Sequence, residues 1–147
     1  MDARSNPSPS QVTPEFNARS FDRPRERPAP SSLRGHWSGG DEAVVELSGV
    51  TLVVAIKSHC DGCREFINTD VHELPVPVLV VSAVDDESSE WRDARQRVLV
   101  SPDAFRLLDL RSAPFYVLVD PIAARVVTEG VLFGASQVAK EIAPYLN

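Results

Sequence analysis

Two cysteines three residues apart are the part of this sequence best suited to chemistry. The 147-residue chain contains two cysteines, Cys60 and Cys63, and they directly follow the β-branched and apolar run Thr51–Lys57. Such a run is typical of a strand that is buried on both faces. The sequence after the pair predicts a short helix over Arg64–Asn68. The cysteines therefore stand where a buried strand ends and a helix begins.

A sulfur atom at the start of a helix meets unpaired backbone N–H groups, which favour the thiolate over the thiol. We expect Cys60 to be the exposed, attacking thiol. Cys63 follows one turn later, and we expect it to be the more buried thiol that resolves a mixed disulfide. The neighbours His59 and Asp61 are expected to tune the pKa of the Cys60 thiol. A protonated imidazole would lower that pKa, whereas the carboxylate would raise it and favour a reducing couple.

Two other uses of the pair differ in kind from redox chemistry. A structural zinc site needs four ligands, and this chain has two cysteines and three histidines, of which His59 and His72 are the candidates. We therefore expect no bound metal, and no cofactor either, because electrons would pass through the cysteines themselves. A module that binds other proteins without catalysis remains an open alternative.

The remaining sequence alternates between strand and helix patterns. Ser101 and Pro102 are typical of an N-cap and a first helical residue. Alternating units followed by a hairpin and a last helix predict an α/β fold, a mixed sheet with helices on both faces. The predicted strands are Ala43–Leu47, Val76–Val84, Val98–Val100, Phe115–Asp120 and Arg125–Gly130, and the predicted helices are Asp85–Gln96, Ala104–Leu110 and Ser136–Leu146.

Composition separates an N-terminal arm from a domain. Residues 1–37 are rich in Pro, Arg and Ser, a composition that cannot bury enough apolar surface to offset its ordering entropy. We interpret 1–37 as a disordered arm and 38–147 as one domain. The net charge of -6 argues against nucleic-acid binding. No stretch approaches the ~20 apolar residues of a membrane helix, and the first residues lack the apolar core of a secretory signal. We therefore expect a cytoplasmic protein, in which thiols stay reduced and a cysteine pair is more often catalytic than structural.

Two regions, Val53–Cys63 and Leu110–Asp120, resemble the thioredoxin-like superfamily. The sequence downstream of the second region is similar to the redoxin branch that includes TlpA-like disulfide reductases. The resemblance implies a thiol–disulfide oxidoreductase that acts on protein disulfides and exchanges electrons with a separate donor or acceptor. It also implies a cis peptide bond before Pro114, which would face the cysteines and, with Ala113, bind the substrate chain.

The sequence departs from relatives of this fold in two places near the pair. His59 stands where thioredoxins usually carry tryptophan, and the strand before the pair lacks their buried acidic residue. Peroxiredoxins share the fold but carry Thr or Ser three residues before the reactive cysteine. Lys57 stands there in this chain, so we do not expect peroxidase activity.

Overall fold

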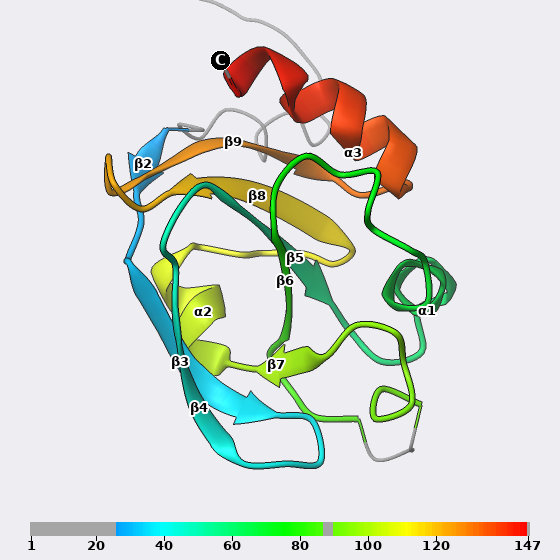
Figure 1. The fold of residues 1–147 in the computed structure, drawn as a ribbon. Coiled ribbons are helices and arrows are strands. Elements are labelled where there is room, and N and C mark those ends of the chain that lie inside the picture. Colours follow the sequence, from blue (N-terminus) through cyan, green and yellow to red (C-terminus); the bar gives the residue numbers. More distant parts are fainter. Residues whose placement is uncertain (1–25, 87–89, 147) are drawn as a thin grey trace, which may run out of the picture.

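The described residues form one eight-stranded mixed sheet with helices on both faces (Figure 1). The structure is a computed structural model that describes residues 26–86 and 90–146. The strands lie in the order β2-β9-β8-β5-β6-β7-β3-β4. Their bounds are β2 Arg27–Pro28, β3 Ser32–Trp37, β4 Glu42–Glu46, β5 Thr51–Ile56, β6 Val78–Ser82, β7 Val98–Val100, β8 Phe115–Asp120 and β9 Arg125–Val131.

Strand β5 lies at the centre and is buried along its whole length, as its unbroken apolar sequence predicts. Its side chains alternate between two hydrophobic clusters because successive residues of a strand point to opposite faces. Leu52, Val54 and Ile56 belong to one cluster. Val53 and Ala55 belong to the other. The strand is thus held from both sides, and its C-terminal end leads into the cysteine pair.

The helices cover the two faces unequally. Helices α1 (Asp61–Ile67) and α3 (Ala135–Ile142) pack on the Leu52 face, and the short 3-10 helix η2 (Ala143–Tyr145) follows α3. Helix α2 (Pro102–Leu107) packs on the opposite face. The predicted N-cap of α2 is confirmed, since the Ser101 hydroxyl accepts a hydrogen bond from the Ala104 N–H. None of the helices in the described residues has the length and apolar character to cross a bilayer.

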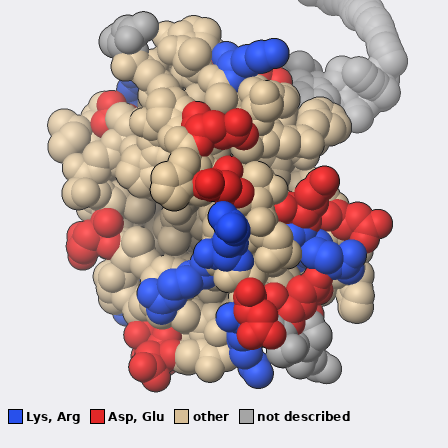
Figure 2. Space-filling view, turned by 45° about the vertical axis from the view of Figure 1, so that its right-hand side comes forward, with Lys and Arg blue, Asp and Glu red and all other residues tan. Residues whose placement is uncertain are grey.

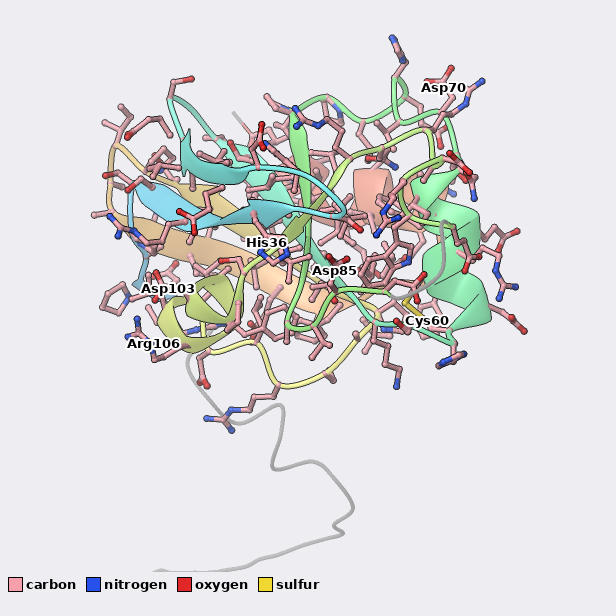
Figure 3. The ribbon with its side chains drawn as sticks, turned by 90° about the horizontal axis from the view of Figure 1, so that it is seen from below. His36, Cys60, Asp70, Asp85, Asp103 and Arg106 are labelled. Carbon is pink, nitrogen blue, oxygen red and sulfur yellow. A yellow bond between two sulfur atoms is a disulfide. The ribbon has the colours of Figure 1, made fainter. Side chains whose placement is uncertain are left out.

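The pairing of the strands brings distant parts of the chain to one edge. Strands β5, β6 and β7 run parallel, so their C-terminal ends meet at the same side of the sheet. Strand β8 runs antiparallel to β5, and the predicted hairpin of β8 with β9 is confirmed. Strand β8 therefore begins at the edge where β5 ends, and the end of the loop that leads into β8 lies beside the cysteine turn (Figure 3).

The start of the domain lies earlier than the sequence predicts. Residues that we assigned to the disordered arm form β2 and β3, and β3 pairs with both β4 and β7. Leu33 is buried, and Arg27 forms an ion pair with Glu129. Short strands that are rich in Ser, Arg and Gly carry little hydrophobic pattern of their own, so tertiary pairing decides their structure. Residues 1–25, the rest of the predicted arm, lie outside the described residues.

The predicted helix over Asp85–Gln96 is wrong for the described part of that segment. Residues 85 and 86 have no regular structure, 90–96 form turns and bends, and 87–89 lie outside the described residues. The Asp85 carboxylate accepts hydrogen bonds from the Ser38 hydroxyl and from backbone N–H groups. Such side-chain acceptors compete with helix formation. Trp91 is buried, as its predicted position on an inner face requires.

Candidate functional site

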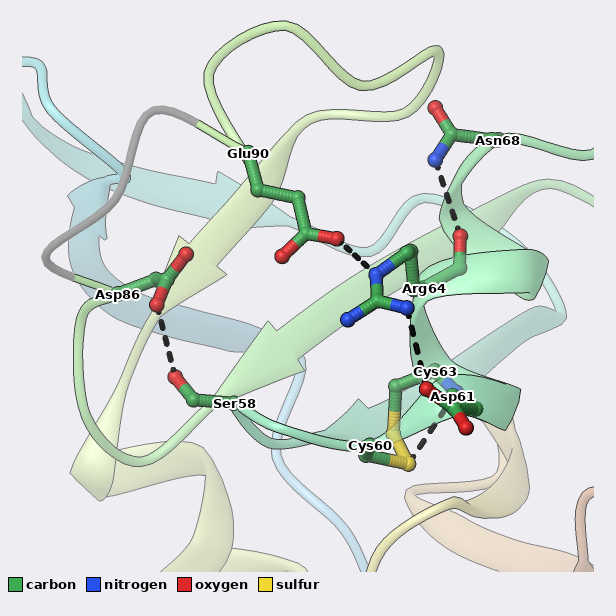
Figure 4. Close-up of polar contacts among 8 residues, drawn as sticks. All are labelled: Ser58, Cys60, Asp61, Cys63, Arg64, Asn68, Asp86 and Glu90. Carbon is green, nitrogen blue, oxygen red and sulfur yellow. Dashed lines mark hydrogen bonds and ion pairs between the residues drawn. A yellow bond between two sulfur atoms is a disulfide. The ribbon is translucent and has the colours of Figure 1, made fainter.

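The cysteine pair closes a disulfide at the start of α1 (Figure 4). The Cα atoms of Cys60 and Cys63 lie 5.2 Å apart. Cys60 is the N-cap residue, and its Sγ accepts a hydrogen bond of 3.2 Å from the Cys63 N–H. The same N–H can stabilise negative charge on the Cys60 sulfur once the disulfide opens, because a hydrogen bond to the charged form favours that form.

The two sulfurs have different environments. Cys63 is 1% exposed and belongs to the cluster around Phe66 and Leu132. Cys60 is half-buried and packs against the edge of that cluster. The sequence predicted that Cys63 is the more buried of the two, and the structure agrees.

His59, which precedes the pair, adopts an unusual backbone conformation. Its φ of 56° lies in the left-handed region, which costs a non-glycine residue about 1–2 kcal/mol. The imidazole is exposed and has no hydrogen bond or ion pair with the described residues. His59 thus turns the chain from β5 into α1, and its predicted influence on the Cys60 thiol stays a prediction.

A chain of charges lies on the outer side of the cysteine turn (Figure 4). Asp61 is 97% exposed, and its Oδ1 lies 3.1 Å from Nη1 of Arg64. The Nε of Arg64 donates to Glu90. The hydrogen bond that the Glu90 carboxylate accepts is the main reason that the pKa of the Arg64 guanidinium is raised, with Asp61 contributing less. The positive charge of Arg64 therefore opposes the predicted effect of the Asp61 charge on Cys60.

The loop before the pair is tied to the neighbouring parallel strand. The Ser58 hydroxyl donates a 3.1 Å hydrogen bond to the buried carboxylate of Asp86 (Figure 4). Neither residue was predicted from the sequence as part of the site. The signal was available, because Ser58 follows β5 and Asp86 follows β6, and parallel neighbours bring their C-terminal ends together. Arg64 was also missed, although its position three residues after Asp61 on a helix favours an ion pair.

The loop into β8 brings Pro114 to the cysteine turn. The Ala113–Pro114 peptide bond is cis. A Cβ atom built on Gly62, between the two cysteines, would lie 3.9 Å from the Cγ of Pro114. Ala113 and Pro114 are both half-buried. The structure thus brings together the two regions, fifty residues apart, that carry the predicted site.

Charges on the α1 side of the molecule are mixed. Figure 2 shows basic and acidic side chains interleaved there rather than gathered in a field of one sign. Among the residues that the structure describes, no group of three or more His, Cys, Asp or Glu side chains could hold a metal ion. The described part of the site therefore consists of a cysteine pair surrounded by charges of both signs, which is compatible with thiol chemistry.

Comparison with solved structures identifies the fold. The thioredoxin domain of a thiol-disulfide oxidoreductase from Bacteroides vulgatus is 18% identical, with a TM-score of 0.58 over 82% of this chain and 96% of that one. A thiol:disulfide interchange protein from Bacteroides sp. is 17% identical, with a TM-score of 0.59 over 84% and 91%. A DsbF homologue from Corynebacterium diphtheriae is 14% identical, with a TM-score of 0.56 over 85% and 95%.

No protein-family model and no curated protein matches the sequence. The similarity to these solved structures establishes a thioredoxin-like fold, as the sequence resemblance predicted.

Proposed function

We propose that the protein is a thiol–disulfide oxidoreductase that exchanges electrons with protein substrates through Cys60 and Cys63. The observation that carries this proposal is the arrangement of the pair: one sulfur caps α1 and accepts a backbone N–H, and the other is buried one turn later. Solved proteins of the same fold are described as thiol-disulfide oxidoreductases and interchange proteins, which supports the proposal.

The reaction proceeds through two exchanges of sulfur partners. In the reduced protein, the Cys60 thiolate attacks a substrate disulfide, forms a mixed disulfide and releases one substrate cysteine as a thiolate. The Cys63 thiolate then attacks the Cys60 sulfur, closes the Cys60–Cys63 disulfide and releases the second substrate thiolate. The substrate gains two electrons that the protein loses. A separate dithiol restores the reduced pair by the same steps in reverse.

Ala113 and Pro114 are proposed to hold the substrate chain next to Cys60. The nearness of Pro114 to Gly62, which stands between the two cysteines, supports this role. An extended substrate segment lying along this loop would gain affinity from main-chain hydrogen bonds without strict sequence requirements. A cytoplasmic location stays a prediction from the sequence. The substrate and the electron donor can be identified by trapping their mixed disulfides with the protein.

A trapping experiment tests the proposed function. Cys63→Ser retains the attacking thiol but cannot resolve the intermediate, so it should accumulate mixed disulfides with a disulfide-containing protein. Cys60→Ser is the matched control and should accumulate none. Wild-type protein should reduce the same substrate with dithiothreitol as the electron donor. Absence of exchange in the wild type, with the fold intact by circular dichroism, would leave the binding module as the better description.

A further inference from the structure

A cavity of about 420 Å³ opens beside the cysteine turn. Its walls are the end of β5 with Ser58, the end of β6 with Val84, helix α2 through Phe105, and the loop that ends at Ala113. In Figure 3 this loop runs from α2 toward Cys60. Ligands of open α/β sheets bind outside the C-terminal ends of parallel strands, which is where this cavity lies. Its volume is within the range of about 300–1,000 Å³ that ligand pockets occupy.

The inner surface of the cavity is mainly apolar. Val84, Phe105 and Leu110 contribute to it, and the Val84 side chain is 71% exposed at its rim. Two of its serine hydroxyls are engaged within the protein, since Ser58 donates to Asp86 and Ser82 donates to the Val84 carbonyl. The cavity therefore offers a ligand apolar contact more than hydrogen bonds.

The charged side chains that line the cavity are both positive. They are Lys57 and Arg111, and no carboxylate is among the lining residues. Arg111 is engaged by Asp109, which accepts from its Nε at 3.1 Å and from its Nη2 at 2.9 Å. The exposed ammonium of Lys57 makes no ion pair with the described residues. In a chain of net charge -6, this cavity thus presents an uncommitted positive charge beside an apolar surface.

We propose that this cavity is a specificity subsite for the substrate protein. It receives an apolar side chain located a few residues from the substrate cysteine, and Lys57 selects substrates with a carboxylate next to that side chain. The assignment rests on the proposed function, because the cavity matters for exchange only if Cys60 attacks a substrate disulfide. Its nearness to the reacting sulfur follows from the sequence: Ser58 is two residues before Cys60, and Ala113 immediately precedes Pro114.

The probe is a set of short peptides with one cysteine each, joined as a mixed disulfide to thionitrobenzoate. Attack by Cys60 on the peptide sulfur releases the coloured thionitrobenzoate thiolate, and Cys63 then releases the peptide thiol and leaves the protein disulfide. One half of the set places Leu or Ser at each position within three residues of the cysteine. The other half keeps Leu at the best position and places Asp or Lys beside it.

For the wild type, Leu in place of Ser should raise kcat/KM about tenfold at one position, the factor expected for partial burial of an aliphatic side chain. Asp in place of Lys beside it should raise kcat/KM about two- to fivefold, as for an exposed ion pair. Ala83→Phe fills the cavity and should abolish the preference for Leu. Ala123→Phe, in the exposed turn between β8 and β9, is its control and should keep the preference.

Lys57→Glu should reverse the preference of Asp over Lys, and Lys57→Gln should remove it. Lys140→Glu makes the same charge change at the other lysine of the chain, on α3, and should keep the wild-type preference. These comparisons use ratios of rates within one variant, so a change in overall activity cancels.

Hydroxyethyl disulfide is small and uncharged, so exchange with it does not depend on the subsite. It therefore distinguishes failure of the subsite from failure of the proposed function. If the reduced wild type exchanges with it but treats all peptides alike, or if Lys57→Glu and Lys140→Glu give the same preference, the subsite is overturned and the proposed function stands. If the reduced wild type exchanges with neither hydroxyethyl disulfide nor any peptide, the proposed function fails and the subsite fails with it.

Discussion

The cysteine turn has an interior side and an exterior side, and different interactions hold each of them. On the interior side, Cys63 and Phe66 pack into the cluster that β5 and α3 share. On the exterior side, Asp61, Arg64 and Glu90 form ion pairs on the surface. Interior packing contributes several kcal/mol and fixes positions, whereas ion pairs exposed to solvent are screened and contribute little to stability. The interior therefore sets the geometry of the cysteine pair, and the exterior charges adjust its redox properties.

Removal of an interior side chain should give the largest effect. Phe66 is 3% exposed, so Phe66→Ala should lower the free energy of unfolding by about 3–5 kcal/mol. Glu65→Ala, at an exposed position of the same helix, is the control and should change it by about 0.5 kcal/mol or less. Urea unfolding followed by circular dichroism measures both. Equal effects would mean that the start of α1 is not held from inside.

The reactivity of the two thiols tests the same contrast at the sulfurs. In the reduced protein at limiting iodoacetamide, Cys60 should be alkylated about tenfold faster than Cys63 or more, since the thiolate must be accessible to react. Mass spectrometry of the digested protein gives the ratio. Equal labelling, or preference for Cys63, would contradict the assignment of Cys60 as the attacking thiol.

A second exterior cluster, around Asp85, should affect the pH dependence of stability. Burial of the Asp85 carboxylate acts to raise its pKa, but hydrogen bonds from Ser38, from the Asp86 and Gly39 N–H groups and from His36 outweigh it and hold the pKa below its usual range. A depressed carboxylate pKa stabilises the folded state above the unfolded pKa, and this contribution is lost as the pH falls through the folded value.

Asp85→Asn should therefore lower the free energy of unfolding by about 1 kcal/mol at pH 7. The difference from the wild type should shrink below about pH 4. Thermal unfolding of both proteins from about pH 2 to about pH 7 measures this difference in stability. A difference that persists unchanged at the lowest pH would show that the Asp85 charge does not contribute.

The smallest effects should come from the charges beside the disulfide. Asp61→Asn removes a negative charge near Cys60 and should make the couple more oxidising, whereas Arg64→Gln should make it more reducing. Each shift should be about 10 mV, because a few tenths of a pKa unit correspond to that size for a two-electron couple at an exposed site. Titration of both variants in one glutathione buffer series compares them, and shifts of the same sign would refute the offset of Asp61 by Arg64.

The interior side could be predicted from the sequence because its signals are local. The unbroken apolar run of β5 and the spacing of Cys60 and Cys63 determine where the pair lies and which sulfur is buried. The second half of the site, within residues 110–120, was predicted from a resemblance to a known superfamily and not from the local sequence pattern.

The exterior side depends on contacts that local patterns do not encode. Glu90 meets Arg64 across 26 residues, and it lies in a segment whose polar composition favoured a helix. The Asp85 carboxylate instead accepts a hydrogen bond from Ser38, 47 residues away in the sequence. This contact holds the start of the segment in a non-helical conformation. Strands β2 and β3 were missed for a related reason, since Arg27 is held by Glu129 on β9 and β3 pairs with β4 and β7.

Whether Cys60 and Cys63 act as one redox pair can be decided by a redox titration of the wild-type protein in glutathione or dithiothreitol buffers, with the thiols counted by alkylation and mass spectrometry. We expect one cooperative transition in which Cys60 and Cys63 are reduced together, with the two-electron response of about 30 mV per tenfold change in the ratio of oxidised to reduced protein. Independent titration of the two cysteines, or a pair that stays in one state across the buffer series, would contradict it.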